Sequence, residues 1–190
     1  TQPVQNFPAL PHVADEMQAI QSLQSGKLLK DENFVAANLE RELRNVPYSV
    51  VHIASHGQFD SDPRKSFLLT YDGKLSMDHL EQLMKFSRFR QDAVELLTLS
   101  ACRTAVGDDR AALGLAGVAI KAGARSALAT LWYINDQASS LLVAEFYREL
   151  AGAPLSKAKA LQKAQRTLLS DPRYRHPGYW SPFLMIGNWL

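Results

Sequence analysis

Short apolar runs alternate along the chain with longer segments of helical periodicity. The run Ser49–Ala54 (SVVHIA) is rich in β-branched residues and leads into Ser-His-Gly, which is typical of a strand buried on both faces. The same kind of run predicts further strands at Phe67–Gly73 (FLLTYDG), Val94–Ala101 (VELLTLSA), Ser126–Trp132 (SALATLW) and Phe183–Trp189 (FLMIGNW). These runs predict a sheet whose strands are largely hidden from water.

Segments between the strands carry apolar residues at helical spacing. A stripe through Val13, Met17 and Ile20 predicts one helix, and a second is predicted near 32–43. Further helices are predicted at 76–85 behind the N-cap Ser76, at 111–122 before Gly123, after Asn135-Asp136, and at 157–169 before Asp171-Pro172. The alternation predicts an α/β fold with a largely parallel central sheet, right-handed crossovers and helices on both faces, a three-layer αβα sandwich.

The length and composition fit one globular domain. With 190 residues, of which 46% are hydrophobic and 21% charged, the chain is long enough for one core and short for two. Residues 1–12 hold three prolines and show no periodicity. We interpret them as a linker or the cut edge of a longer chain, and 13–190 as a single domain.

The charge balance and the cysteine content narrow the function classes. Lys plus Arg number 21 and Asp plus Glu 19, and they are scattered, so neither nucleic acid nor a membrane surface is an expected partner. The most apolar region, 113–134, is interrupted by Lys121, Gly123 and Arg125, and the first residues lack the pattern of an export signal. A single cysteine allows no internal disulfide and no cysteine-based metal cluster. We therefore expect a cytoplasmic protein.

Two residues with catalytic potential follow predicted strands. His56 comes two residues after the strand at 49–54, and Cys102 directly follows the one at 94–101. Because ligands gather at the carboxyl ends of parallel strands, both side chains are expected at the same edge of the sheet. A thiol is a strong nucleophile only as the thiolate, which a neighbouring imidazole or the positive end of a helix favours. The pair therefore indicates nucleophilic chemistry.

Each of these residues also has an ordinary structural interpretation. A lone cysteine is frequently a buried apolar residue, and a histidine beside a sheet is common. Gly57 lets the backbone come close to a bound group, so its N–H, with that of Cys102, can serve an oxyanion; an ordinary turn glycine is the alternative. His52, inside its strand, is interpreted as structural. The chain has no GxxxxGK[ST], no GxGxxG after a strand and no GxSxG, which argues against nucleotide-binding and serine-hydrolase domains.

Five strings of the sequence, in the order in which they occur, resemble the CHAT family. They are VHIASHGQFD, LLTLSACRTAVG, GARSALATLWYINDQAS, EFYREL and HPGYWSPFLMIGNW. CHAT domains are caspase-like peptidase domains often joined to tetratricopeptide repeats, and the separases carry a related dyad. The resemblance covers about 10–190 of the chain.

The resemblance implies a caspase-like fold and a cysteine endopeptidase that cleaves protein substrates. It implies His56 as general base and Cys102 as nucleophile, with the N–H groups of Gly57 and Cys102 as oxyanion donors, and it implies no cofactor and no metal. It also implies an upstream tetratricopeptide-repeat or other regulatory domain or partner that gates the activity. Because many relatives resemble scaffolds or toxin-system effectors, the alternative is a catalytically silent scaffold or protein-interaction module.

The segment LWYINDQA bears on substrate choice. Asp136 falls where the similar segment of separases is associated with an acidic pocket, which implies Arg or Lys at P1. The alternative is that Asp136 only caps a helix beginning at Gln137. Trp132, which closes its strand, is a candidate wall of the pocket. Other candidate acids are those on the rim loops: Asp60, Asp62, Asp108 and Asp109.

Overall fold

The chain folds into two compact units. The computed structural model describes residues 1–59, 65–88, 94–100, 103–104, 123–132, 134–152 and 154–190. One unit, here called the sheet unit, contains Leu29–Tyr133 and Ile186–Asn188. The other, the helical unit, contains Thr1–Leu28, Ile134–Met185 and Trp189–Leu190. The sheet unit is therefore made from two separate stretches of the chain.

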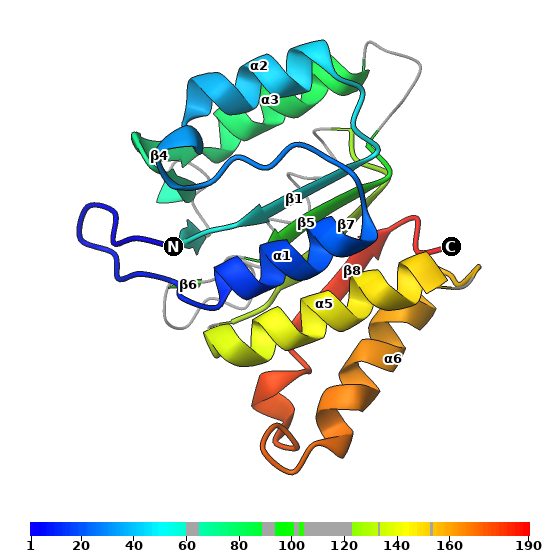
Figure 1. The fold of residues 1–190 in the computed structure, drawn as a ribbon. Helices are drawn as coiled ribbons and strands as arrows, with labels where there is room; N and C mark the ends of the chain where they lie inside the picture. Colours follow the sequence, from blue (N-terminus) through cyan, green and yellow to red (C-terminus); the bar gives the residue numbers. More distant parts are fainter. Residues whose placement is uncertain (60–64, 89–93, 101–102, 105–122, 133, 153) are drawn as a thin grey trace. The chain divides into compact units, whose positions relative to one another are not determined.

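The central sheet consists of short apolar strands. Its order is β1-β5-β7-β8, with β1 at Val50–Ala54, β5 at Leu96–Ser100, β7 at Ser126–Thr130 and β8 at Phe183–Gly187 (Figure 1). β1 is parallel to β5, and β5 is parallel to β7. Just after β8, the Asn188 N–H donates to the Arg125 carbonyl oxygen, 2.7 Å away, at the start of β7. Because β1, β5 and β7 run the same way, their carboxyl ends meet at one edge of the sheet.

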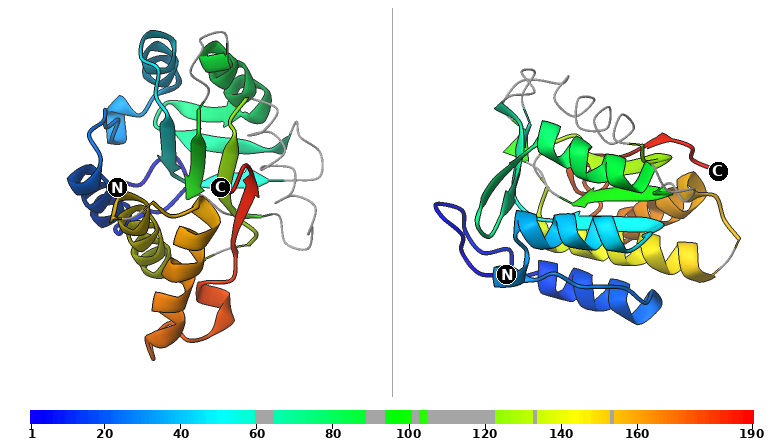
Figure 2. Two further views of the ribbon diagram at one scale, coloured as in Figure 1. Left: turned by 90° about the vertical axis from the view of Figure 1, so that its right-hand side faces the viewer. Right: turned by 90° about the horizontal axis from the view of Figure 1, so that it is seen from above.

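One face of this sheet packs against α2 (Ala36–Asn45) and α3 (Met77–Arg88), which lie side by side (Figure 2). Alternate strand residues point into this core, because side chains alternate between the two faces of a strand. These residues are Val51 and Ile53 of β1, Leu97 and Leu99 of β5, and Ala127 and Ala129 of β7. On the opposite face Leu96, Thr98 and Leu128 are also buried, so β5 and β7 have no solvent-facing side. β1 differs from the expectation, because its residues on that face are only half-buried.

A second sheet in the same unit begins where the chain leaves β1. Its order is β4-β3-β2-β6, with β2 at Gly57–Phe59, β3 at Phe67–Thr70, β4 at Gly73–Ser76 and β6 at Arg103–Thr104. β3 is antiparallel to both β2 and β4, whereas β2 and β6 are parallel. In the turn between β3 and β4, Asp72 Oδ1 accepts hydrogen bonds from the Thr70 hydroxyl at 2.8 Å and from the Ala36 N–H at 3.3 Å. The turn therefore also caps the first residue of α2.

The helical unit contains α1 (Val13–Leu23), α5 (Asp136–Gly152) and α6 (Lys157–Ser170). α5 packs against both of the other helices. Phe146 and Tyr147 of α5 are both 0% exposed, and their ring centroids lie 5.4 Å apart in an edge-to-face arrangement. Such large buried rings dominate the packing energy of a small unit.

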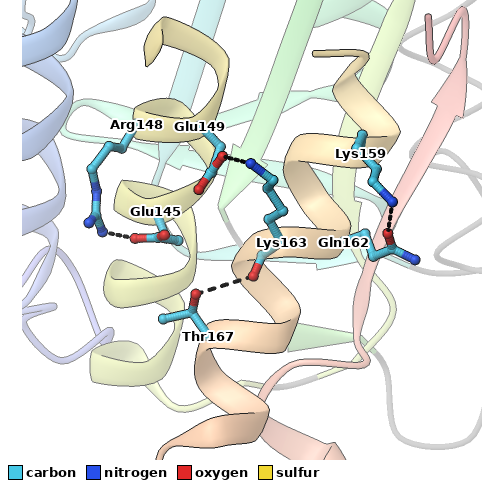
Figure 3. A network of polar contacts seen from close by, with 7 residues as sticks. All are labelled: Glu145, Arg148, Glu149, Lys159, Gln162, Lys163 and Thr167. Atoms are coloured by element: carbon cyan, nitrogen blue, oxygen red, sulfur yellow. Dashed lines mark hydrogen bonds and ion pairs between the residues drawn. The ribbon is translucent and has the colours of Figure 1, made fainter. Parts of the chain in front are cut away.

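Polar contacts border the packing of α5 against α6 (Figure 3). Lys163 Nζ of α6 lies 2.8 Å from Glu149 Oε2 of α5, and the Thr167 hydroxyl donates to the Lys163 carbonyl oxygen at 3.2 Å. Within α5, Arg148 pairs with Glu145. The Lys163–Glu149 pair, which joins the two helices, is partly exposed. Such a pair contributes about 0–1 kcal/mol, so the packing of the two helices rests on their apolar faces.

The fold predicted from the sequence is confirmed. The chain is α/β, with a mostly parallel central sheet flanked by helices, as in a caspase-like sandwich. The predicted N-cap is also present, because the Ser76 hydroxyl accepts the His79 N–H at 3.2 Å. No helix within the described ranges is long and apolar enough to cross a membrane.

Two predicted elements need correction. The helix expected near 32–43 starts only at Ala36, because Asp31–Asn33 form a separate 3-10 turn in which Asp31 has a φ of 48°. The strand at Phe67–Thr70 belongs to the second sheet, where it has antiparallel partners on both sides. The helix predicted at 111–122 lies outside the described residues.

Candidate active site

Two of the predicted site residues lie at the carboxyl edge of the central sheet, after strands that are separated by β5. β1 ends at Ala54 and His56 follows two residues later; β7 ends at Thr130 and Trp132 follows two residues later. His56 is half-buried, and Trp132 is 41% exposed. Both residues therefore lie at the edge where ligands of parallel sheets bind.

Hydrogen bonds hold the backbone on both sides of His56. The Ser55 N–H donates to the Ser100 carbonyl oxygen at 3.3 Å, and the Ser55 hydroxyl donates to the Leu69 carbonyl oxygen at 2.5 Å. The Leu69 N–H in turn donates to the His56 carbonyl oxygen at 2.8 Å. His56 is thus placed by both sheets at once, at the point where the chain passes from one to the other.

Gly57 is the first residue of β2, so its interpretation as a turn glycine is wrong. It pairs with Leu68 of β3. Because the adjacent bond runs from the Leu69 N–H to the His56 carbonyl, Gly57 and Leu68 form a non-hydrogen-bonded pair. The Gly57 N–H is therefore directed away from β3, to the side of β2 on which β6 lies.

Cys102 lies outside the described residues, but the chain is described on both sides of it. Ser100, at the end of β5, pairs with Ala54 of β1. Arg103, at the start of β6, pairs with Gln58 of β2. His56 is midway along the chain between Ala54 and Gln58. The segment that carries His56 and the segment that carries Cys102 are therefore paired with each other twice, once before these two residues and once after them.

Asp136 lies in the helical unit, as the first residue of α5. Its Oδ2 accepts the backbone N–H of His12 at 3.0 Å. The helix cap is instead Asn135, whose Oδ1 accepts the Ala138 N–H at 3.0 Å. The interpretation of Asp136 as the cap of a helix beginning at Gln137 is therefore wrong, because the helix starts one residue earlier and its neighbour supplies the cap.

The remaining predicted acids cannot be placed at this edge. Asp60, Asp62, Asp108 and Asp109 lie outside the described residues. Among the residues that the structure does describe, no group of three or more His, Cys, Asp and Glu side chains could hold a metal ion.

An open groove on the second sheet is a feature that the sequence reasoning missed. It measures about 350 Å³, and its lining includes Gln58, Lys65, Ser66, Phe67, Lys74 and Ser76. A sequence signal for it existed, because Asp72-Gly73 directly after the apolar run FLLTY is typical of a turn that returns the chain. Recognising that hairpin would have placed Phe67 and Ser76 on adjacent strands, as the register has them.

Comparison with known proteins identifies the class to which this fold and this edge belong. Residues 2–188 match the CHAT domain. The human "Tetratricopeptide repeat protein 28" is 32% identical to this chain over 69 residues, which is 36% of this chain and 3% of the human protein. The chain thus spans a small part of the length of that relative. It belongs to the CHAT domain family, which is caspase-like.

Proposed function

We propose that this chain is a cysteine endopeptidase in which Cys102 is the nucleophile and His56 the general base. The observation that carries the proposal is the pairing of Ala54 with Ser100 and of Gln58 with Arg103, on either side of the two residues. The site would lie at the carboxyl edge of the sheet, where substrates of such folds bind. Membership of a caspase-like family supports the same class of reaction.

The reaction is an acyl transfer in two halves. His56 takes the proton from Cys102 Sγ, and the thiolate attacks the carbonyl carbon of the scissile peptide bond. As the C–N bond breaks, His56 gives that proton to the leaving amine. Water, deprotonated by His56, then attacks the thioester, releases the carboxylic acid and restores the thiol.

The tetrahedral intermediates of both halves carry a negative oxygen. We propose the N–H groups of Gly57 and Cys102 as its hydrogen-bond donors. The direction of the Gly57 N–H, away from β3 and to the side of β6, supports this role, since Arg103 of β6 directly follows Cys102. One such donor typically contributes about 10²–10³ in kcat.

For substrate choice we propose Arg or Lys at P1, with Asp136 as the residue that recognises its charge. Trp132 is proposed separately as a substrate-binding residue at the carboxyl edge of the central sheet. Asp136 uses Oδ2 for the His12 N–H, and within the described part of the chain Oδ1 accepts no hydrogen bond. A carboxylate with an acceptor oxygen to spare suits a guanidinium or ammonium group. Trp132 offers 41% of its surface, and an aromatic face stacks well against such cations.

Regulation is proposed to come from outside the 190 residues. The human relative bears the name of a tetratricopeptide repeat protein, and the matched part is 3% of its length. We propose that this chain likewise works beside a tetratricopeptide-repeat region or partner that gates its activity.

Alkylation tests the dyad without any knowledge of the substrate. Cys102 is the single cysteine, so iodoacetamide reports on it alone. At neutral pH we expect alkylation of the unaltered chain to be at least about tenfold faster than that of His56→Ala, because an adjacent imidazole favours the thiolate. His79→Ala, in α3, is the matched control and should react like the unaltered chain. Equal rates in all three proteins would contradict the dyad.

Peptide cleavage tests the reaction itself. A pool of fluorogenic peptides varied at P1 is offered to the unaltered chain, Cys102→Ala and His56→Ala. We expect cleavage after Arg or Lys by the unaltered chain, at a low rate because the proposed gating partner is missing, and none by either variant. Rapid alkylation with no cleavage of any peptide would fit either a fully gated enzyme or the catalytically silent scaffold, and full activity of the chain by itself would contradict the gating.

A further inference from the structure

The groove on the second sheet places two positive charges next to the candidate active site. Lys65 and Lys74 are both exposed and both line it. Gln58, another wall, is two residues beyond His56. Since a strand rises about 3.3 Å per residue, the groove begins roughly 7 Å along β2 from the proposed base.

The floor of the groove is a row of residues across three paired strands. Gln58 of β2 is directly opposite Phe67 of β3, and Phe67 is directly opposite Ser76 of β4. Phe67 is 6% exposed, and its ring centroid lies 4.2 Å from Lys74 Nζ. The groove therefore has an apolar floor, the Phe67 ring, and the Lys74 ammonium group lies over it.

Among the described residues that line the groove, those that carry a charge are both positive. Within the described ranges, neither Lys65 nor Lys74 forms an ion pair with a carboxylate, and no acid is among the described lining residues. Two ammonium groups beside one another attract an anion, so the groove suits an anionic ligand. Phe67 and the methylenes of the lysines suit the carbon chain of that ligand.

We propose that this groove binds an acidic side chain of the protein substrate, with a Glu or Asp carboxylate between Lys65 and Lys74 and its methylenes against Phe67. The inference rests on the proposed function, because it assigns a substrate class to the same enzyme. A peptide bound at the edge near His56 and continuing along β2 would place a residue about two positions from the scissile bond over the groove. The substrate would thus carry an acidic residue close to the bond that is cut.

Binding to a protein that cannot turn substrate over tests the groove separately from catalysis. The Cys102→Ala chain is titrated against two fluorescein-labelled peptides, Gly-Ser-Glu-Glu-Ser-Gly and Gly-Ser-Gln-Gln-Ser-Gly, and anisotropy is followed at low ionic strength. We expect the glutamate peptide to bind at least about tenfold more tightly, and Lys65→Gln or Lys74→Gln to weaken it about fivefold each. Lys27→Gln removes the same charge from an exposed lysine of the helical unit and should change nothing.

Three results would overturn the proposal. The first is equal binding of the two peptides, and the second is a loss in Lys27→Gln as large as in the groove variants. The third is displacement of the glutamate peptide by micromolar inorganic phosphate at matched ionic strength, which would assign the groove to a phosphate group. Selective binding in a chain whose Cys102 alkylates no faster than in His56→Ala would sustain the groove while refuting the proposed peptidase. Unselective binding in a chain with a reactive Cys102 would refute the groove alone.

Discussion

At the scale of single residues, Asn135 and Asp136 show how neighbours with similar side chains take different roles. The Asn135 amide oxygen caps α5, and the Asp136 carboxylate accepts the His12 N–H. The cap follows from a rule that the sequence displays, since Asn and Asp are both good N-caps, but the rule does not choose between adjacent positions. The contact with His12 joins residues 124 apart in the chain, and no local pattern could predict it.

The two positions can be separated experimentally. Asn135→Ala should lower the free energy of unfolding by about 1 kcal/mol in urea titrations, because the Ala138 N–H loses its acceptor. Asp136→Asn keeps an acceptor for the His12 N–H and should stay within about 1 kcal/mol of the unaltered chain. If Asp136 recognises P1, only its variant lowers kcat/KM for Arg and Lys substrates, by at least about tenfold. An equal loss of P1 preference in both variants would contradict that role.

Tyr48 is a residue whose titration the structure changes. Its pKa is raised above the ordinary value by burial first and then by its hydrogen bond to the Glu42 carboxylate, 3.0 Å away, and by the charge of that carboxylate. Protonated Tyr48 therefore contributes to the free energy of unfolding. This contribution is fully present below the pKa of tyrosine in the unfolded chain, about 10, and is lost as the pH rises through the higher pKa of Tyr48 in the folded chain. We expect Glu42→Gln to bring the tyrosinate absorbance change of Tyr48 to lower pH, with Tyr48→Phe as the subtraction control. An unchanged titration in Glu42→Gln would leave burial as the sole cause.

At the scale of elements, the strands of the central sheet were the most predictable part of the chain. β5 and β7 are short, apolar and buried on both faces, and this pattern appears directly in the sequence. β1 was expected to be buried on both faces, but its residues alternate between buried and half-buried, so that part of the prediction is wrong. β2 and β4 were missed because they have three and four residues, and because their pairing depends on a turn rather than on periodicity. The start of α2 was misplaced for a similar reason, since a carboxylate from the β3–β4 turn determines where it begins.

Core packing of the sheet gives an expectation for stability. Leu97 is 0% exposed and is flanked in register by Val51 of β1 and Ala127 of β7. Leu97→Ala should lower the free energy of unfolding by about 2–5 kcal/mol, because a cavity remains where the side chain was. Leu141→Ala, on the exposed side of α5 at 43% exposure, is the matched control and should change it by less than about 1 kcal/mol. Comparable losses from both, measured by denaturant unfolding, would contradict this account of the core.

At the scale of the whole molecule, the chain leaves and re-enters its sheet unit. Leu29–Tyr133 form most of that unit, and Ile186–Asn188 return to it after the helical unit has been built. The return is secured at Arg125, whose carbonyl accepts the Asn188 N–H while its own N–H donates to the Val94 carbonyl at 2.8 Å. The sequence predicts the last strand. It cannot show to which of the two units that strand belongs, because this depends on contacts between residues far apart in the chain.

Truncation separates the role of Ile186–Asn188, which belong to the sheet unit, from that of Trp189–Leu190, which belong to the helical unit. Ending the chain at Met185 removes residues 186–190, which include the end of β8 and the Asn188 N–H that donates to Arg125. We expect the amides of β7 to exchange with solvent at least about tenfold faster, because β7 loses part of its neighbouring strand. Ending it at Asn188 removes Trp189 and Leu190, whose carbonyls accept from Ala158 N–H at 3.1 Å and from Lys157 Nζ at 2.7 Å in the helical unit. That shorter loss should leave β7 protected. Faster exchange of β7 in both truncations would contradict the division.

In the site, too, features that follow from strand direction could be predicted, and features that depend on contacts between distant residues could not. The sequence could predict that His56 and Trp132 reach one edge, since that follows from strand direction alone. It could not predict the groove at Lys65 and Lys74, because the two lysines come together through a hairpin whose strands were not recognised.

The pairing of Ala54 with Ser100 and the pairing of Gln58 with Arg103, here called the two rungs, enclose segments of unequal length. From one rung to the next, the chain advances four positions on the histidine side and three on the cysteine side, a count that the sequence numbers give directly. If the proposed dyad operates, this count sets its alignment. A one-residue insertion or deletion between the rungs would then silence the enzyme while leaving both residues in the sequence. Relatives that retain the histidine and the cysteine should therefore be sorted into active and inactive members by residue count between the rungs as much as by residue identity.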